Sequence, residues 1–153
     1  MWQFKLAERV GCRVLAAALL LSSAASAVDQ SECKTCSPSQ MDLNQCAENR
    51  LNEVDDELNR VYHAIISKYK EDREFLEKLR NAQHAWLIFR DAELAARFPA
   101  GCKQSQYGSI YPMCAAHFLA QRTQERIRQL REWLDGVEEG DVCAGSVQIK
   151  QEH

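Results

Sequence analysis

The sequence lacks the patterns that are typical of β-strands and of several large enzyme classes. No segment alternates apolar and polar residues as a half-buried strand does, and there is no internal repeat or low-complexity segment. A GxSxG motif, an HExxH motif and a glycine-rich phosphate loop are all missing. We therefore expect an all-α protein with no catalytic residues, no cofactor and no bound metal.

The chain also lacks an N-terminal apolar run long enough to cross a membrane. The run Val14–Leu21 falls short of the roughly 20 residues that a spanning helix needs. Three basic residues precede it, and Ala25-Ser26-Ala27 follows it in the small-x-small pattern of a cleavage site. Residues 1–27 are therefore predicted to be a cleaved secretory signal, with an uncleaved anchor as the alternative. The mature protein is predicted to be periplasmic or secreted, without stable membrane insertion.

Positive charge is scarce in the predicted mature chain. The whole chain has 19 Lys and Arg against 22 Asp and Glu, a formal net charge of −3. Residues 1–27 hold three basic residues and one acidic residue, so their removal leaves 16 against 21, a net charge of −5. Nucleic-acid-binding proteins usually present a basic face, so no nucleic-acid partner is expected. The acidic balance suits a basic protein partner.

Six cysteines follow residue 27, and an even number in a short exported chain is typical of disulfide bonds. The Cys33-x-x-Cys36 pair has two alternatives, a redox site or half of a metal site. A redox CxxC usually lies in a βαβ unit, and zinc requires two further ligands at matching spacing. Disulfides are the preferred interpretation, and the candidates are Cys33, Cys36, Cys46, Cys102, Cys114 and Cys143.

Apolar residues recur at steps of three and four in three segments, as they do in amphipathic helices. The first helix is predicted from residue 38 for roughly thirty residues, with Ser37 as N-cap and Gln40 completing a capping box. Its apolar stripe is Ala47, Leu51, Val54, Leu58, Val61 and Ile65. A break is predicted at Lys70–Asp72, because the aspartate can cap a second helix. One continuous helix over 38–97 is the alternative.

The second helix is predicted from about Asp72 to Arg97, where Pro99 and Gly101 stop it. Its predicted core stripe is Phe75, Leu79, Ala82, Trp86 and Phe89, with Glu93 continuing the series.

The third helix is predicted from Pro112 to about Gly136, after a loop that is rich in small polar residues. Its stripe is Met113, Ala116, Ala120, Thr123, Ile127, Leu130 and Leu134. An acidic tail, 137–153, is predicted to be tied by Cys143 and to be disordered beyond it. Three helices with one apolar stripe each must bury these stripes against each other. The predicted fold is therefore a small disulfide-stapled bundle of three main helices.

Charged residues border the apolar stripes of all three helices. Asp55 lies on the first helix, Arg90 and Glu93 on the second, and Arg122 on the third. A charge beside a buried stripe needs a partner, because desolvating it alone costs several kcal/mol in order of magnitude. We interpret the four as an ion network between helices. The alternative is that Asp55 and Glu93 form a catalytic acid pair, as in a glycosidase. We prefer the network, because neighbouring arginines would keep both acids ionised and leave no proton donor.

Together, several short motifs resemble the lysozyme inhibitor LprI-like N-terminal domain family. The residues that carry the resemblance are Asp55-x-x-Leu58-Asn59-x-x-Tyr62, Leu79-x-x-Ala82-Gln83-x-x-Trp86-x-x-Phe89-Arg90-Asp91-Ala92-Glu93 and Gly108-Ser109-x-x-Pro112-Met113, followed by Cys114 and Arg122. The match covers about Cys36 to Leu134, so residues 28–136 are predicted to form the domain. The resemblance extends the structural polar network to Asp55, Asn59, Gln83, Arg90, Asp91, Glu93 and Arg122.

Two positions depart from the family pattern. Leu94 replaces a cysteine that usually follows the FRDAE run, and Leu119 replaces a threonine on the third helix. With Cys102 supplying the missing thiol, the resemblance implies a Cys102–Cys114 disulfide. Cys46 would then pair with Cys36 or Cys33, and Cys143 would pair with whichever of these two cysteines is left.

The resemblance implies a binding protein that inhibits lysozyme by blocking its cleft. Exposed carboxylates suit this role, because lysozymes are often strongly basic, and the candidates are Glu138, Glu139 and Asp141. The loop Cys102–Tyr111 is a second candidate contact. An immunity protein against a peptidoglycan-degrading toxin is a related possibility. The alternative class is a non-inhibitory binding or scaffold module of the cell envelope.

Overall fold

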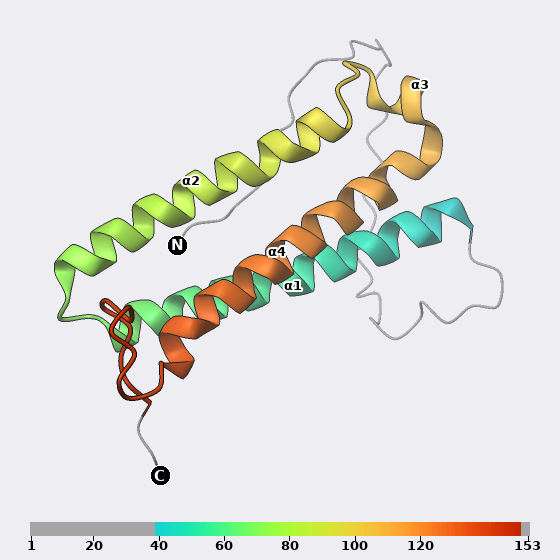
Figure 1. The fold of residues 1–153 in the computed structure, drawn as a ribbon. Helices are drawn as coiled ribbons and strands as arrows, with labels where there is room; N and C mark the ends of the chain where they lie inside the picture. Colours follow the sequence, from blue (N-terminus) through green and yellow to red (C-terminus); the bar gives the residue numbers. More distant parts are fainter. Residues whose placement is uncertain (1–38, 151–153) are drawn as a thin grey trace, which may run out of the picture.

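The computed structural model describes residues 39–150, which fold into three long helices (Figure 1). The elements are α1 (Gln40–Lys68), α2 (Arg73–Arg97), α3 (Lys103–Tyr107), the 3₁₀ helix η1 (Gly108–Ile110) and α4 (Tyr111–Asp135). Within these residues the only β-type pairing is an isolated parallel bridge, Val137 with Ile149. The all-α prediction with three main helices is confirmed. No helix between residues 39 and 150 has both the length and the apolar character to span a bilayer.

The start of α1 lies slightly later than the sequence suggested. Ser39 is the N-cap, and its backbone N–H donates to Asp42 Oδ2 at 2.9 Å while Asp42 N–H donates to Ser39 Oγ at 3.3 Å. The prediction of Ser37 as the cap was wrong, because a carboxylate three residues on completes the capping box for Ser39. Ser37 itself lies outside the described residues.

The predicted break between the first two helices is confirmed. α1 ends at Lys68, and Asp72 caps α2 by accepting a 2.9 Å hydrogen bond from the Phe75 N–H. A single continuous helix over 38–97 is therefore excluded, and α2 can fold back beside α1 and α4 (Figure 1).

The apolar stripe of α1 is buried as predicted, at Ala47, Leu51, Val54, Leu58, Val61 and Ile65. α4 follows its prediction closely, although Phe118 and Leu119 are buried as well and Met113 and Leu134 are only half-buried. These two helices pack along most of their length and form the main contact of the bundle.

The predicted stripe of α2 was only partly right: Leu79 is buried, and Phe75 and Trp86 pack half-buried against the core, but the other two residues do not. Ala82 is exposed, and the Phe89 side chain is 57% exposed on the outside of the molecule. The buried positions of α2 are Leu76, Leu79, Gln83, Arg90 and Leu94. The helix carries apolar residues on two faces, and the face that packs inward is the one that holds two polar side chains. The predicted stripe lies between these two faces, sharing Leu79 with the buried one and Phe89 with the exposed one.

The apolar core consists of two separate clusters. One contains Ile65, Leu76 and Leu130 and ends at an aromatic group, in which the Phe75 ring lies 4.6 Å from the Tyr69 ring and 4.5 Å from the Trp133 ring, centroid to centroid. The other contains Ala47, Leu51, Leu94, Ala116, Phe118, Leu119 and Ala120. Apolar burial therefore stabilises both ends of the bundle, whereas the middle must be held together by other interactions.

The segment after α4 is ordered and docks on the first cluster. The Gln148 N–H donates to Tyr69 Oη at 3.3 Å, and Tyr69 Oη donates to the Trp133 carbonyl at 3.1 Å. The prediction of disorder beyond Cys143 was wrong for residues 144–150. Backbone hydrogen bonds between residues 137 and 148–150 hold the segment.

Two glycines of this segment provide a matched test of that docking. Gly136 (φ +77°) and Gly140 (φ +92°) both adopt a left-handed conformation, so Ala is strained at each. A Cβ at Gly136 would also lie 2.6 Å from the Gln148 carbonyl oxygen, whereas a Cβ at Gly140 meets nothing within 4 Å. Gly136→Ala should lower the free energy of unfolding by about 1 kcal/mol more than Gly140→Ala. Urea unfolding measures both, and equal losses would contradict the docked arrangement.

Candidate functional site

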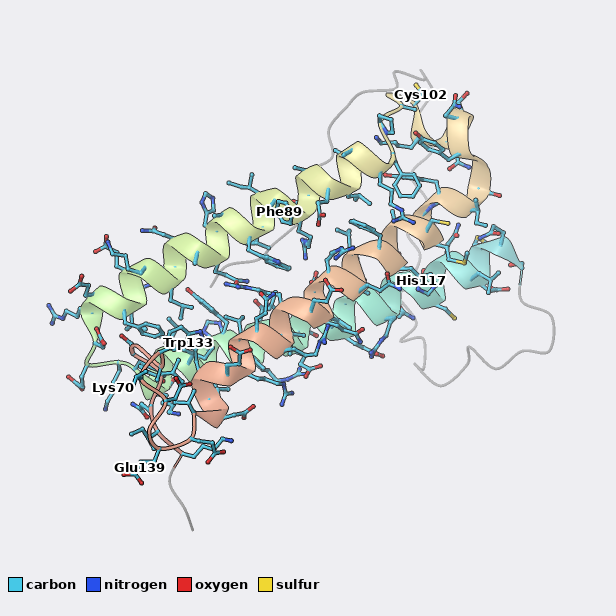
Figure 2. All side chains as sticks on the ribbon, viewed as in Figure 1. Lys70, Phe89, Cys102, His117, Trp133 and Glu139 are labelled. Atoms are coloured by element: carbon cyan, nitrogen blue, oxygen red, sulfur yellow. The ribbon has the colours of Figure 1, made fainter. Side chains whose placement is uncertain are left out.

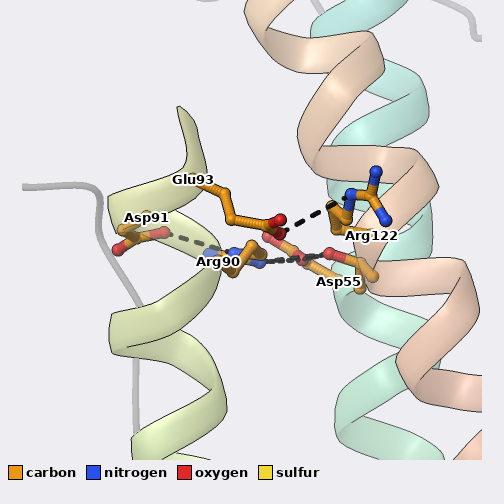
Figure 3. A network of polar contacts seen from close by, with 6 residues as sticks. Asp55, Arg90, Asp91, Glu93 and Arg122 are labelled. Carbon is orange, nitrogen blue, oxygen red and sulfur yellow. Dashed lines mark hydrogen bonds and ion pairs between the residues drawn. The ribbon is translucent and has the colours of Figure 1, made fainter. Parts of the chain in front are cut away.

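The middle of the bundle is a polar layer that separates the two apolar clusters (Figure 3). We use this name for Asp55 of α1, Gln83, Arg90, Asp91 and Glu93 of α2, and Arg122, Thr123 and Arg126 of α4. Each helix passes from one cluster to the other at this level, for example between Leu51 and Val54 on α1. Among residues 39–150, this is the level of the core at which charged side chains of all three long helices meet.

Arg90 is the centre of the polar layer and joins all three long helices. Its side chain is only 5% exposed. Its Nη1 donates to Asp55 Oδ1 at 3.3 Å and to Thr123 Oγ1 at 3.1 Å, and its Nε donates to Asp91 Oδ1 at 3.2 Å. The guanidinium carbon also lies 5.3 Å from the Trp86 ring centroid, in cation–π contact. One side chain thus has its charge balanced by carboxylates of α1 and α2 and donates hydrogen bonds to α1, α2 and α4.

Burial raises the pKa of Asp55 above its ordinary value, against the opposing effect of Arg90 and the hydrogen bond from Thr123. Burial, and not the neighbouring arginine, therefore sets the direction of this pKa shift. Asp55 side-chain exposure is 30%, and the loss of water around the charged form outweighs the attraction of the guanidinium. The free energy gained from the ion pair is therefore partly offset by the cost of removing the two charged groups from water.

The second ion pair of the layer is looser. Arg122 Nε lies 3.7 Å from Glu93 Oε2, and neither atom, although buried, makes a hydrogen bond among the described residues. Arg122 Nη1 also bonds Glu125 Oε2 at 2.8 Å, and the guanidinium lies over the Phe118 ring. Because each acid of the suggested Asp55–Glu93 pair is matched with its own arginine, the contacts favour the network interpretation over the acid-pair alternative.

The remaining predicted members of the network are placed differently. Gln83 is buried, and its Oε1 accepts from Arg126 Nε at 3.0 Å. Asn59 is half-buried and makes no side-chain hydrogen bond with another residue of 39–150. Sequence reasoning missed Arg126 and the polar role of Thr123, which is fully buried. A hydroxyl in an otherwise apolar stripe was the available signal for Thr123, because buried hydroxyls need a partner.

The cysteines depart from the predicted pairing. Cys114 and Cys143 carry free thiols, so the Cys102–Cys114 disulfide and the tie through Cys143 were both wrong. Cys143 lies in an exposed turn whose backbone N–H bonds Asp141 Oδ1 at 2.9 Å, and the tail is held by backbone contacts instead. Cys46 is disulfide-bonded, and its predicted partners, Cys33 and Cys36, lie outside the described residues. Over residues 39–150, no three His, Cys, Asp or Glu side chains gather as metal ligands would.

The exposed carboxylates predicted for partner contact lie on the segment after α4. Glu138 pairs with Lys150, while Glu139 lies at the outer end of the segment (Figure 2). Val142, beside Asp141, is 96% exposed. We call residues 138–142 the acidic loop. It presents carboxylates and one apolar side chain to solvent from a segment that is fixed to the bundle.

The other predicted contact, Cys102–Tyr111, is helical rather than an open loop. It contains α3 and η1, and the rings of Tyr107 and Tyr111 lie 5.3 and 5.2 Å from the Phe98 ring, centroid to centroid. Asn44 Nδ2 of α1 donates to the Ser109 carbonyl at 2.9 Å. The two tyrosines of this connection therefore pack on the bundle, whereas Ile110 is 44% exposed.

The polar layer predicts a large effect of removing Arg90. Arg90→Met leaves Asp55 without its guanidinium and should lower the free energy of unfolding by about 3 kcal/mol. Arg50→Met, which removes an exposed ion pair with Glu53, should change it by less than about 0.5 kcal/mol. The double variant Asp55→Leu with Arg90→Met should recover part of the loss, because no charge stays buried. Equal effects of the Arg90 and Arg50 variants would contradict the role given to Arg90.

The raised pKa of Asp55 predicts a specific pH dependence. A carboxyl whose pKa is higher in the folded than in the unfolded protein stabilises the fold below the unfolded value, and loses this contribution as the pH rises through the folded value. The free energy of unfolding of the native chain, minus that of Asp55→Asn, should therefore grow as the pH falls from 7 towards about 4. Urea unfolding across this range measures it, and a difference that shrinks would contradict the assignment.

Comparison with known proteins agrees with the motifs. The family model described as Lysozyme inhibitor LprI matches residues 31–130, which include the whole polar layer. An uncharacterized protein of Rhizobium meliloti (strain 1021) is 33% identical over 111 residues, which cover 65% of this chain and 77% of that protein. No solved structure matches the chain. The polar layer and the three helices that it joins lie almost wholly within the matched residues. This chain therefore belongs to the lysozyme inhibitor LprI family.

Proposed function

We propose that the protein is an exported inhibitor of lysozyme or of a related peptidoglycan hydrolase, and that it acts by binding and not by catalysis. The observation that carries the proposal is family membership over residues 31–130. The contacts of the polar layer support it, because the charged side chains of the core are matched with one another.

Export to the periplasm or the exterior is part of the proposal. The support is the signal-like pattern of residues 1–27 and the disulfide of Cys46, which suits an oxidising compartment. Lysozymes and secreted peptidoglycan-cutting toxins act in the same compartment, so inhibitor and target would meet there.

The acidic loop is our candidate for the contact surface. Its carboxylates complement a basic enzyme and would speed the encounter, since charges of opposite sign steer association. Val142 supplies an apolar side chain with no cover among the described residues. The hydrogen bonds between residues 137 and 148–150 hold the loop in place, so little conformational entropy is lost on binding.

The connection Cys102–Tyr111 is the weaker candidate. Its tyrosines contact Phe98 and each other, so their rings are occupied within the bundle. Apart from Ile110, which is 44% exposed, the residues left at its surface are small or polar, and none of them is acidic.

Lysis of cell walls by a chicken-type lysozyme tests the function directly. The purified protein should inhibit lysis, and Glu139→Lys should raise the inhibition constant about tenfold at low salt, because the charge reversal opposes the enzyme's positive field. Glu48→Lys makes the same charge change at an exposed position on the first turns of α1 and is the matched control.

Two outcomes would count against the proposal. Equal inhibition by the Glu139 and Glu48 variants would exclude the acidic loop as the contact. No inhibition at large molar excess, across several lysozyme types, would favour the alternative of a binding or scaffold module of the cell envelope.

A further inference from the structure

α2 has a second apolar stripe that faces away from the bundle. Its residues follow one another at helical steps, are exposed and carry no charge. They are Asn81, Ala85, Ile88, Phe89, Ala92 and Ala96. We call this set the outer stripe. It lies opposite the buried face that contains Leu76, Leu79, Gln83, Arg90 and Leu94.

The outer stripe is unusual for a solvent-facing surface. Ile88 and Phe89 are 59% and 57% exposed and adjoin each other in the middle of a 25-residue helix. The residues on either side of them in the stripe include the small side chains of Ala85 and Ala92. Nothing in residues 39–150 covers the stripe, and contiguous exposed apolar surface of this kind marks an interaction site.

We propose that the outer stripe binds the same stripe of a second copy of this chain, with the two α2 helices antiparallel. With the two-fold axis near Ile88 and Phe89, these two side chains meet their counterparts. Ala85 then lies opposite Ala92 of the other copy, and Asn81 opposite Ala96. Large side chains at the centre and small ones on both sides allow close approach of the helices.

Charge complementarity supports the antiparallel pairing. His84 and Asp91 lie on the same edge of the outer stripe, two turns apart, and both are exposed. In an antiparallel pair, equivalent edges of the two helices face each other, so His84 of one copy approaches Asp91 of the other, twice. The imidazole N–H can donate to the carboxylate, which also accepts from Arg90 Nε. The dimer would therefore extend the polar layer across the interface.

The proposal is independent of the inhibitory function. The other conceivable occupants of the stripe are residues 28–38 of the same chain and the target enzyme. The match between His84 and Asp91 at the edge of the stripe favours a second copy of the same helix as the occupant.

Sedimentation velocity on the full chain, exported and purified from the periplasm, tests the proposal. The native protein should sediment as a dimer. Phe89→Glu places two like charges at the centre of the interface and should weaken dimerisation about 30-fold or more. The far-ultraviolet helical signal should stay unchanged, because Phe89 makes no core contact. Met41→Glu, at a 77% exposed apolar side chain on α1, is the control and should stay dimeric.

A photo-cross-linking amino acid at position 88 identifies the occupant. A covalent dimer with the cross-link in α2 of the other copy, near Phe89 and Ala92, supports the proposal. Cross-links to residues 28–38, cross-links to lysozyme alone, or a monomeric native protein would each overturn it. A monomeric protein that still inhibits lysozyme would overturn the dimer and leave the proposed function standing.

Discussion

The arrangement of the three helices depends on a single buried guanidinium. Arg90 bonds α1 through Asp55 and α4 through Thr123, while Asp91 and Trp86 contact it from its own helix. Apolar contacts alone allow helices to slide or rotate, since they are non-directional. A planar donor group with partners on three helices permits one register only. The interaction contributes specificity more than free energy, because burying Asp55 beside it is costly.

The polar layer also accounts for the division of the core. The apolar cluster on each side limits the access of water to the layer, which strengthens the electrostatic contacts of its most buried charged member, Arg90, and raises the cost of leaving them unmade. The arginines of the layer lie over aromatic rings, Arg90 and Arg126 on Trp86 and Arg122 on Phe118. These cation–π contacts leave the N–H groups of Arg90, Arg122 and Arg126 free to form hydrogen bonds.

The two proposed surfaces differ in their chemistry and lie on different elements. The acidic loop is charged and belongs to the segment after α4, whereas the outer stripe is uncharged and belongs to α2. An inhibitor that pairs through α2 would therefore keep both of its acidic loops free. The family match covers residues 31–130, and the acidic loop lies beyond its end.

The sequence by itself determined the elements and most of their inward faces. The capping aspartate at position 72, the stop after Arg97 and the regular stripes of the first and third helices are local properties, and local backbone preference decides them. Only the tertiary structure decided which apolar face of α2 packs inward, because that choice depends on partners from other helices. The face with Arg90 packs inward because Asp55 of α1 and Thr123 of α4 accept hydrogen bonds from it there. The pKa of Asp55, the free thiols and the docked tail likewise depend on distances through space, which periodicity along the chain does not encode.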